Sequence, residues 1–122
     1  MPDTQVYQQA CPLLVPYIED SGKNKKILTL ILEEYLHDLK KRNIDSLLLA
    51  CTHYEIIEED IKKIIGKKVK VISEGRIVAK KLKEYLDKHP EIENKLEKEK
   101  TVTYFFSDPD QDNAKLLKLF FK

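Results

Sequence analysis

Short apolar runs alternate along this chain with longer segments in which apolar residues recur every three or four positions. The clearest run, residues 45–50 (DSLLLA), lies between two such segments, 25–42 and 54–65. A run this short is typical of a strand buried on both faces, whereas the flanking spacing is typical of helices with one apolar side. Strands that alternate with helices favour right-handed crossovers and a mainly parallel sheet. The sequence therefore predicts an α/β fold.

The same alternation continues towards the end of the chain. Residues 68–73 (KVKVIS) predict a second strand and residues 75–88 a further helix. The charged segment 88–100 predicts an exposed linker with at most one helical turn. Residues 101–106 (TVTYFF) are β-branched and aromatic and predict a third strand, before a closing helix over 113–122. We expect a partial three-layer α/β/α sheet of three parallel strands.

The composition sets limits on the class of protein. The chain has 122 residues, the size of one ordinary domain, and 22 basic against 21 acidic residues. A net charge of +1 gives no indication of nucleic-acid binding, which would need a clustered basic surface. No apolar stretch is long enough to cross a bilayer, and the first residues lack a signal-peptide pattern, so we expect a cytoplasmic protein away from membranes. In that setting its two cysteines are expected to be free thiols.

Two further local patterns give structural expectations. Pro12, Pro16 and Gly22 interrupt any long helix in residues 1–24, which we expect to be irregular but packed, with Cys11 as a structural residue. The helix over 54–65 should end at Gly66. Its inner face should carry Ile57, Ile61, Ile64 and Ile65.

Cys51, Thr52 and His53 follow directly after the strand predicted at 45–50. Ligands bind at the carboxyl ends of strands in open α/β sheets, and a thiol at the start of a helix ionises more readily. Thr52 and Glu55 have the spacing of a capping box, and an imidazole exchanges protons near neutral pH. This set of groups suits proton transfer on a small anionic substrate.

A structural interpretation of the same residues stands beside the catalytic one. A cysteine next to an apolar strand is usually a small buried hydrophobic residue, and a nearby histidine usually a surface or satisfied core residue. Spacing alone favours that interpretation. A zinc site would need two further ligands at typical spacing, so we expect no metal here.

The stretch LLLACTHYEII, residues 47–57, resembles the second cysteine motif of glutamate racemases, members of the aspartate/glutamate racemase superfamily. QQACPLLVPYIE, residues 8–19, resembles the family's upstream segment, whose trailing acid is here Glu19. Residues 69–82 and 102–121 resemble the strand, turn and helix segments that follow in the family. The similarity runs over nearly the whole chain, and Cys-Thr-His-Tyr is its most specific part.

The resemblance implies a cofactor-independent enzyme that makes D-glutamate for peptidoglycan. In this family two cysteines flank the substrate: one thiolate removes the α-proton, and the other thiol protonates the opposite face. By position, Cys51 would be the second cysteine and would act on L-glutamate. Thr52 and His53 would contact the substrate, His53 would assist proton transfer at Cys51, and Glu19 would support His53.

The chain also departs from the family pattern. A full racemase has two similar α/β lobes, and the first lobe's Asp-Ser-Gly turn, Tyr-Gly pair and first cysteine motif are not found here. The chain therefore resembles the carboxyl-terminal half. Residues 1–68 would belong to the second lobe, and residues 69–122 would complete the first. Glu55 and Glu74 stand where the family has a proline and a small residue.

Three functional interpretations follow from this partial resemblance. The chain is half of a glutamate racemase, active only when a separate chain supplies the other cysteine. Alternatively, it is a non-catalytic remnant or a binding module of the same fold. Finally, it is half of an aspartate racemase, although the Thr-His pair after Cys51 favours the glutamate branch. A homodimer remains open in each case.

Overall fold

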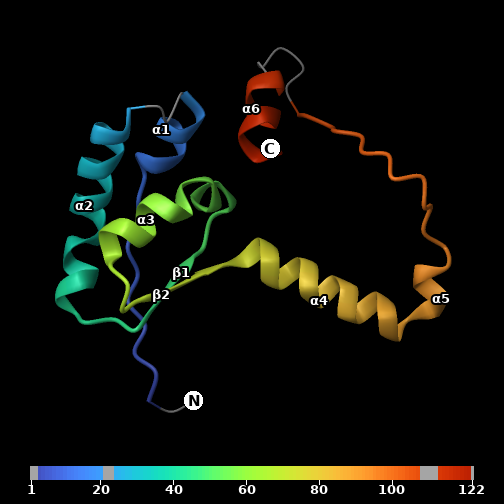
Figure 1. Cartoon of the computed structure of the whole chain (residues 1–122), viewed down its shortest axis with the longest axis horizontal. Coiled ribbons are helices and arrows are strands. Elements are labelled where there is room, and N and C mark those ends of the chain that lie inside the picture. The colour runs from blue at the N-terminus through green and yellow to red at the C-terminus, as the bar shows by residue number, and fades with distance from the viewer. Residues whose placement is uncertain (1–2, 21–23, 108–112, 122) are drawn as a thin grey trace. The chain divides into compact units, whose positions relative to one another are not determined.

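The computed structural model describes residues 3–20, 24–107 and 113–121. The chain divides into two compact units, Met1–Ser73 and Glu74–Lys122. The first unit carries all the residues proposed from the sequence for the site, and it holds the sheet. Each unit is described by itself below (Figure 1).

The first unit combines helices with a small parallel sheet (Figure 1). Its two strands pair in parallel, with Ser46 opposite Lys70 and Leu49 opposite Ser73. The elements in chain order are α1 (Leu14–Asp20), α2 (Lys25–Lys41), β1 (Ser46–Leu49), the 3-10 helix η1 (Thr52–Ile57), α3 (Glu58–Ile65) and β2 (Lys70–Ser73). The strands predicted at 45–50 and 68–73 are thus confirmed, as is the α/β class.

The core lies between the helices and one face of this sheet. Leu49 of β1 is 3% exposed, and Leu47 and Val71 pack partly buried against the same cluster. Leu48 points to the opposite face, as strand alternation requires, and is 57% exposed. The buried helical residues are Leu14, Ile18, Leu28, Leu32, Leu36, Leu39, Ile57, Ile61 and Ile65.

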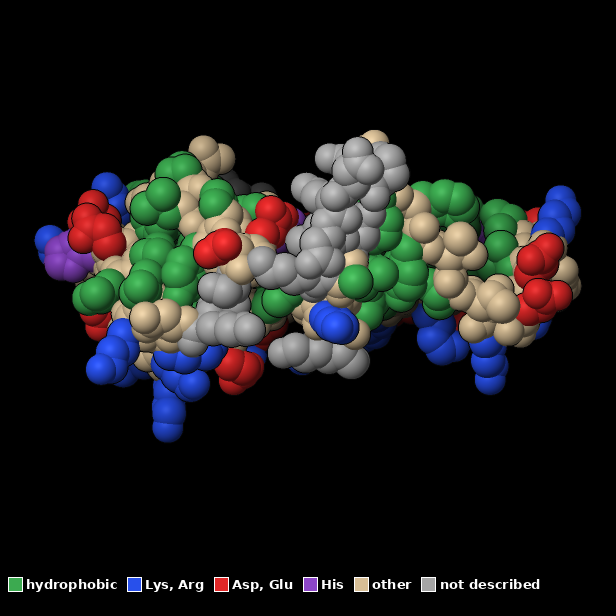
Figure 2. All heavy atoms as spheres, turned by 90° about the horizontal axis from the view of Figure 1, so that it is seen from above, with side chains coloured by type: hydrophobic (Ala, Val, Ile, Leu, Met, Phe, Trp, Pro, Cys, Tyr) green, Lys and Arg blue, Asp and Glu red, His purple; other side chains and the backbone are tan. Residues whose placement is uncertain are grey.

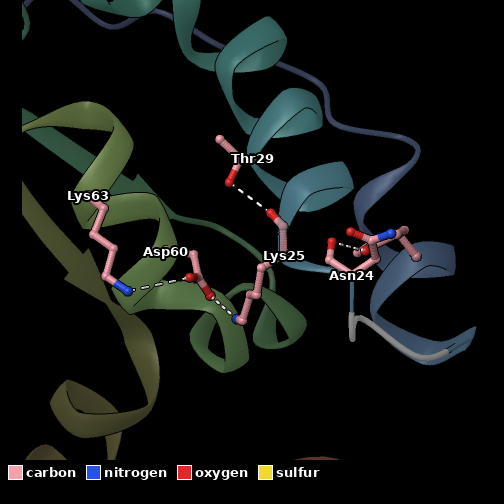
Figure 3. A network of polar contacts seen from close by, with 6 residues as sticks. Asn24, Lys25, Thr29, Asp60 and Lys63 are labelled. Atoms are coloured by element: carbon pink, nitrogen blue, oxygen red, sulfur yellow. Dashed lines mark hydrogen bonds and ion pairs between the residues drawn. The ribbon is translucent and has the colours of Figure 1, made fainter.

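Helix α2 begins at a side-chain cap and is tied to α3 (Figure 3). The Asn24 side-chain oxygen accepts hydrogen bonds from the backbone N–H groups of Lys26 at 3.1 Å and Ile27 at 3.4 Å. These donors have no partner within the helix, so the cap satisfies them. Lys25 of α2 and Lys63 of α3 both pair with Asp60, at 2.5 and 3.7 Å. The two helices are therefore linked at the end where α2 starts.

The helix predicted over 54–65 forms in two pieces. Residues 52–57 adopt 3-10 geometry before the α-helix begins at Glu58. The predicted Thr52–Glu55 capping box is wrong: Cys51 is the N-cap residue, in an extended conformation (φ −153°, ψ 131°), and no side chain caps this start. Gly66 ends α3 at φ 96°, as predicted, because a left-handed conformation favours glycine.

Residues 14–20 form a helix where an irregular segment was predicted. Pro16 is the third residue of α1. A proline is tolerated in the first turn because the N–H it lacks would have had no partner there. Leu14 and Ile18 lie one turn apart and are 2% and 1% exposed, so packing against the core outweighs the weak local propensity.

The second unit contains α4 (Glu74–Lys88), the single turn α5 (Pro90–Glu93) and α6 (Asn113–Phe120). The predicted linker turn is thus confirmed. None of the described residues of α4 and α5 is buried, and Val78, Leu82 and Tyr85 of α4 are exposed. Hydrophobic side chains lie open on the molecular surface in Figure 2. No helix in the described part of the chain has the length and apolarity to cross a membrane.

The strand predicted at 101–106 is not formed. These residues carry no regular structure, and Val102 and Phe105 are 70% and 90% exposed. High β-propensity does not make a strand without a neighbouring strand to bond to. The described residues therefore contain two strands, not three. The boundary between the two compact units falls after Ser73, and β2 pairs with β1 inside the first unit. The assignment of the parts to two racemase lobes stays a prediction.

Candidate active site around Cys51

Cys51 lies at the junction predicted from the sequence. It follows β1 by two residues and is the N-cap residue of η1. Its side chain is partly buried, and both Cys51 and Cys11 are free thiols, as predicted. The thiol is thus held at the carboxyl end of β1, next to backbone N–H groups at the start of a helix.

Polar contacts connect this thiol to His53, and His53 in turn to Glu19. The Cys51 Sγ lies 4.0 Å from His53 Nδ1, and His53 Nε2 lies 2.8 Å from Glu19 Oε1. When Nε2 carries the proton and donates it to the carboxylate, Nδ1 presents a lone pair towards the sulfur. The proximity of Glu19 to His53 that the resemblance implied is present in the structure.

The side chains around Cys51 are exposed to solvent to different degrees, as expected for a site that is open on one side. Thr52 is exposed and Cys51 is partly buried. The His53 side chain is 20% exposed, and that of Glu19 is 42% exposed. A substrate approaching this surface would meet the hydroxyl of Thr52 and the thiol of Cys51 together, with the imidazole behind them. The arrangement can accept or donate a single proton at the sulfur.

Tyr54 joins the segments that carry the two cysteines, a contact that the sequence analysis missed. Its hydroxyl donates a hydrogen bond of 3.4 Å to the carbonyl oxygen of Cys11. Burial raises the pKa of Tyr54, and the charges that Cys11 and Cys51 carry when ionised raise it further. Burial also raises the pKa of the Cys11 thiol, which donates to the Gln9 carbonyl at 3.6 Å. The position of Tyr54 within the quoted motif was the only available signal.

A cavity of about 700 Å³ opens next to the site but is distinct from it. It reaches Ala50 and Tyr54, which flank residues 51–53 on either side, while Cys51 does not line it. Its walls are mainly apolar side chains from residues 4–11, from α2 and from β1. Within the described residues, no group of three or more His, Cys, Asp or Glu side chains could hold a metal ion.

Comparisons with known proteins lead to one family. No family model matches the chain. It is 37% identical over 113 residues to the glutamate racemase of Thermoanaerobacter pseudethanolicus and 34% identical over 115 residues to that of Aquifex aeolicus. These matches cover 89% and 94% of this chain. The chain belongs to the glutamate racemase family. The resemblance recognised in the cysteine motif therefore extends over most of the sequence.

Solved structures of glutamate racemases have the same fold over this region. The chain superposes on the Francisella tularensis glutamate racemase, solved with D-glutamate, with a TM-score of 0.74 at 33% identity over 98% of its length. A Bacillus anthracis glutamate racemase isoform gives a TM-score of 0.67 at 33% identity over 71% of this chain. The α/β fold that the resemblance predicted for this chain is thereby confirmed.

The matches cover only part of each relative. This chain spans 40% of the T. pseudethanolicus racemase, 41% of the A. aeolicus racemase and 44% of the F. tularensis structure. Partial coverage of this size agrees with the prediction that the chain corresponds to about half of a racemase.

Proposed function

We propose that this chain supplies one half of a glutamate racemase active site, in which Cys51 is the acid and base for one face of the substrate. The line of contacts from Cys51 through His53 to Glu19 is the observation that carries the proposal. Membership of the glutamate racemase family supplies the substrate, and the product D-glutamate would serve peptidoglycan synthesis.

The proposed reaction balances as two proton transfers without a cofactor. The Cys51 thiolate takes the α-proton of L-glutamate, and the C–H electron pair stays on the α-carbon as a planar carbanion. A thiol on the opposite face then gives its proton to that carbon, which yields D-glutamate, and its sulfur becomes the thiolate. Two positioned groups are needed because a single group cannot reach both faces of the plane. The opposite thiol would come from residues outside these 122.

Each neighbour of Cys51 has a proposed part in this reaction. The Nδ1 of His53 faces the sulfur and would take its proton before the carbanion forms. Glu19 is a positioning residue that keeps the proton on Nε2. Thr52 is exposed beside the thiol, and its hydroxyl would bind the substrate carboxylate, where charge grows as the α-proton leaves.

The test combines this chain with the part of the T. pseudethanolicus racemase that lies outside the match, expressed as a separate polypeptide. Formation of D-glutamate from L-glutamate is followed with a stereospecific assay. We expect product only with both polypeptides present, and a loss of about a hundredfold or more in Cys51→Ala, because the base for L-glutamate is removed.

Cys11→Ala is the matched control, since it removes the other thiol of the chain and should leave D-glutamate formation within about threefold. L-Aspartate is offered in parallel, and faster turnover of aspartate would move the assignment to aspartate racemase. Binding of the two polypeptides without any D-glutamate, or equal rates with and without Cys51, would favour the non-catalytic remnant.

A further inference from the structure

A slot lies between β1 and residues 4–10. Both segments line the same cavity of about 700 Å³, and Leu32, Leu36 and Leu39 of α2 form part of its wall. Residues 4–10 lead along the chain to α1, and β1 leads to η1. The two helices α1 and η1 pack against each other. The two segments therefore run in the same direction along opposite sides of the slot (Figure 1).

The edge of β1 that faces away from β2 has no strand beside it among the described residues. The Lys70 N–H donates to the Asp45 carbonyl at 2.8 Å, which directs the polar groups of Asp45 towards β2. Because backbone direction alternates along a strand, the N–H and C=O groups of Ser46, Leu48 and Ala50 point away from β2. An exposed strand edge of this kind is a template for another strand.

The opposite side of the slot is fixed in place without being paired. The Arg42 guanidinium lies over the Tyr7 ring, 4.5 Å from its centroid. At the far end, the Leu13 N–H donates to the Tyr35 hydroxyl at 3.2 Å. Val6, next to the first anchor, is 77% exposed, and residues 4–10 form no strand hydrogen bonds. The segment is thus extended and held beside an apolar opening.

We propose that this slot binds a parallel β-strand from the part of a glutamate racemase that lies outside these 122 residues. The strand would bond to Ser46, Leu48 and Ala50 along one edge and to residues 4–10 along the other. A strand paired on both edges in a parallel sheet is apolar on both faces, which suits the leucines of α2.

Two observations select this occupant over a second copy of the chain. The matches span 40% and 41% of the two relatives, so more than half of each relative lies outside the match and can provide the strand. The only unpaired β-rich segment among the described residues is 101–106, and its Thr101 and Thr103 alternate with apolar residues. That pattern gives one polar face, whereas both faces of a central strand are buried.

The experiment measures amide hydrogen exchange by NMR in the intact chain, alone and with the outlying part of the T. pseudethanolicus racemase. We expect protection of the Ser46, Leu48 and Ala50 amides to rise at least about tenfold on binding, because each gains a strand partner. The Leu47 and Leu49 amides face β2 already and should change less. Protection at Val71 and Ser73, on the outer edge of β2, would instead overturn the proposal, as would an absence of binding.

Two lysine variants with similar exposure test the slot itself. Leu48→Lys places a charge on β1 at a residue 57% exposed, and Leu30→Lys places one on α2 at a residue 66% exposed outside the slot. We expect Leu48→Lys to weaken binding about tenfold or more and Leu30→Lys to leave it within about twofold. Equal affinities would overturn the proposal. Val6→Lys, on the other side of the slot, repeats the test if Leu48→Lys fails to fold.

The proposal rests on the family assignment but not on the chemistry of Cys51. The same exchange measurement in Cys51→Ala should show unchanged protection, so failure of catalysis and failure of strand binding are separable. Protection of Ser46, Leu48 and Ala50 that rises with the concentration of this chain alone would identify a second copy as the occupant and overturn the proposal.

Discussion

At the scale of single residues, Cys51, His53 and Glu19 form one line of polar contacts. The sequence predicted that Cys51 follows a strand, because a short apolar run indicates one, but only one face of β1 is buried. The contact between Glu19 and His53 spans 34 positions and followed only from the family resemblance. The Tyr54–Cys11 contact was missed, since no local rule connects a hydroxyl to a carbonyl group 43 positions away.

The two thiols should differ in their reactivity. Burial raises the pKa of Cys11, because a thiolate is poorly solvated in apolar surroundings. In Cys51→Ala, where Cys11 is the remaining thiol, we expect the pH midpoint of iodoacetamide alkylation to lie above that of the same chain unfolded in urea. A raised pKa in the folded state also means that this group stabilises the fold below its ordinary pKa. That contribution is lost as pH rises through the folded value. A midpoint equal to or below the unfolded reference would contradict this.

At the scale of elements, the apolar periodicity predicted where helices form but not the residues at which they begin. The helix at 25–42 was predicted nearly to the residue, because its apolar spacing and its basic last turn agree. The start of the helix at 54–65 was placed wrongly, since Cys51 rather than Thr52 takes the N-cap position. Residues 101–106 were misassigned because strand formation depends on a partner that their sequence cannot report.

The cap of α2 gives a stability prediction. Asn24→Ala removes the acceptor for the Lys26 and Ile27 N–H groups, so we expect the free energy of unfolding to fall by about 1 kcal/mol in urea titration. Asn24→Asp keeps an acceptor at the helix start and should remain within about 0.5 kcal/mol of the wild type. The Tyr17 hydroxyl bonds to the Asn24 backbone and is retained in both variants. Equal stabilities of the Ala and Asp variants would show that this cap does not stabilise α2.

At the scale of the whole molecule, the sequence predicted the fold class and family but could not count the strands of the sheet. Among the described residues, only the unit that contains β1 and β2 has a buried core, and a cavity of about 700 Å³ lies beside the unpaired edge of β1. Large hydrophobic side chains such as Leu30, Leu82 and Phe105 are 55–90% exposed. Surfaces of this kind are typical of contacts with other protein. Both proposals require residues from the remaining part of a glutamate racemase: a strand for the slot, and a second thiol for the active site.

The most direct measurement follows the α-hydrogen itself, with both racemase polypeptides combined in heavy water. Starting from L-glutamate, we predict that the first D-glutamate formed carries solvent deuterium at the α-carbon while the remaining L-glutamate does not. This is expected because, in the proposed reaction, Cys51 removes the proton and a different thiol supplies the deuteron. The same mixture with Cys51→Ala should form no D-glutamate. D-Glutamate that retains the original hydrogen, or that forms equally fast without the Cys51 thiol, would contradict the account.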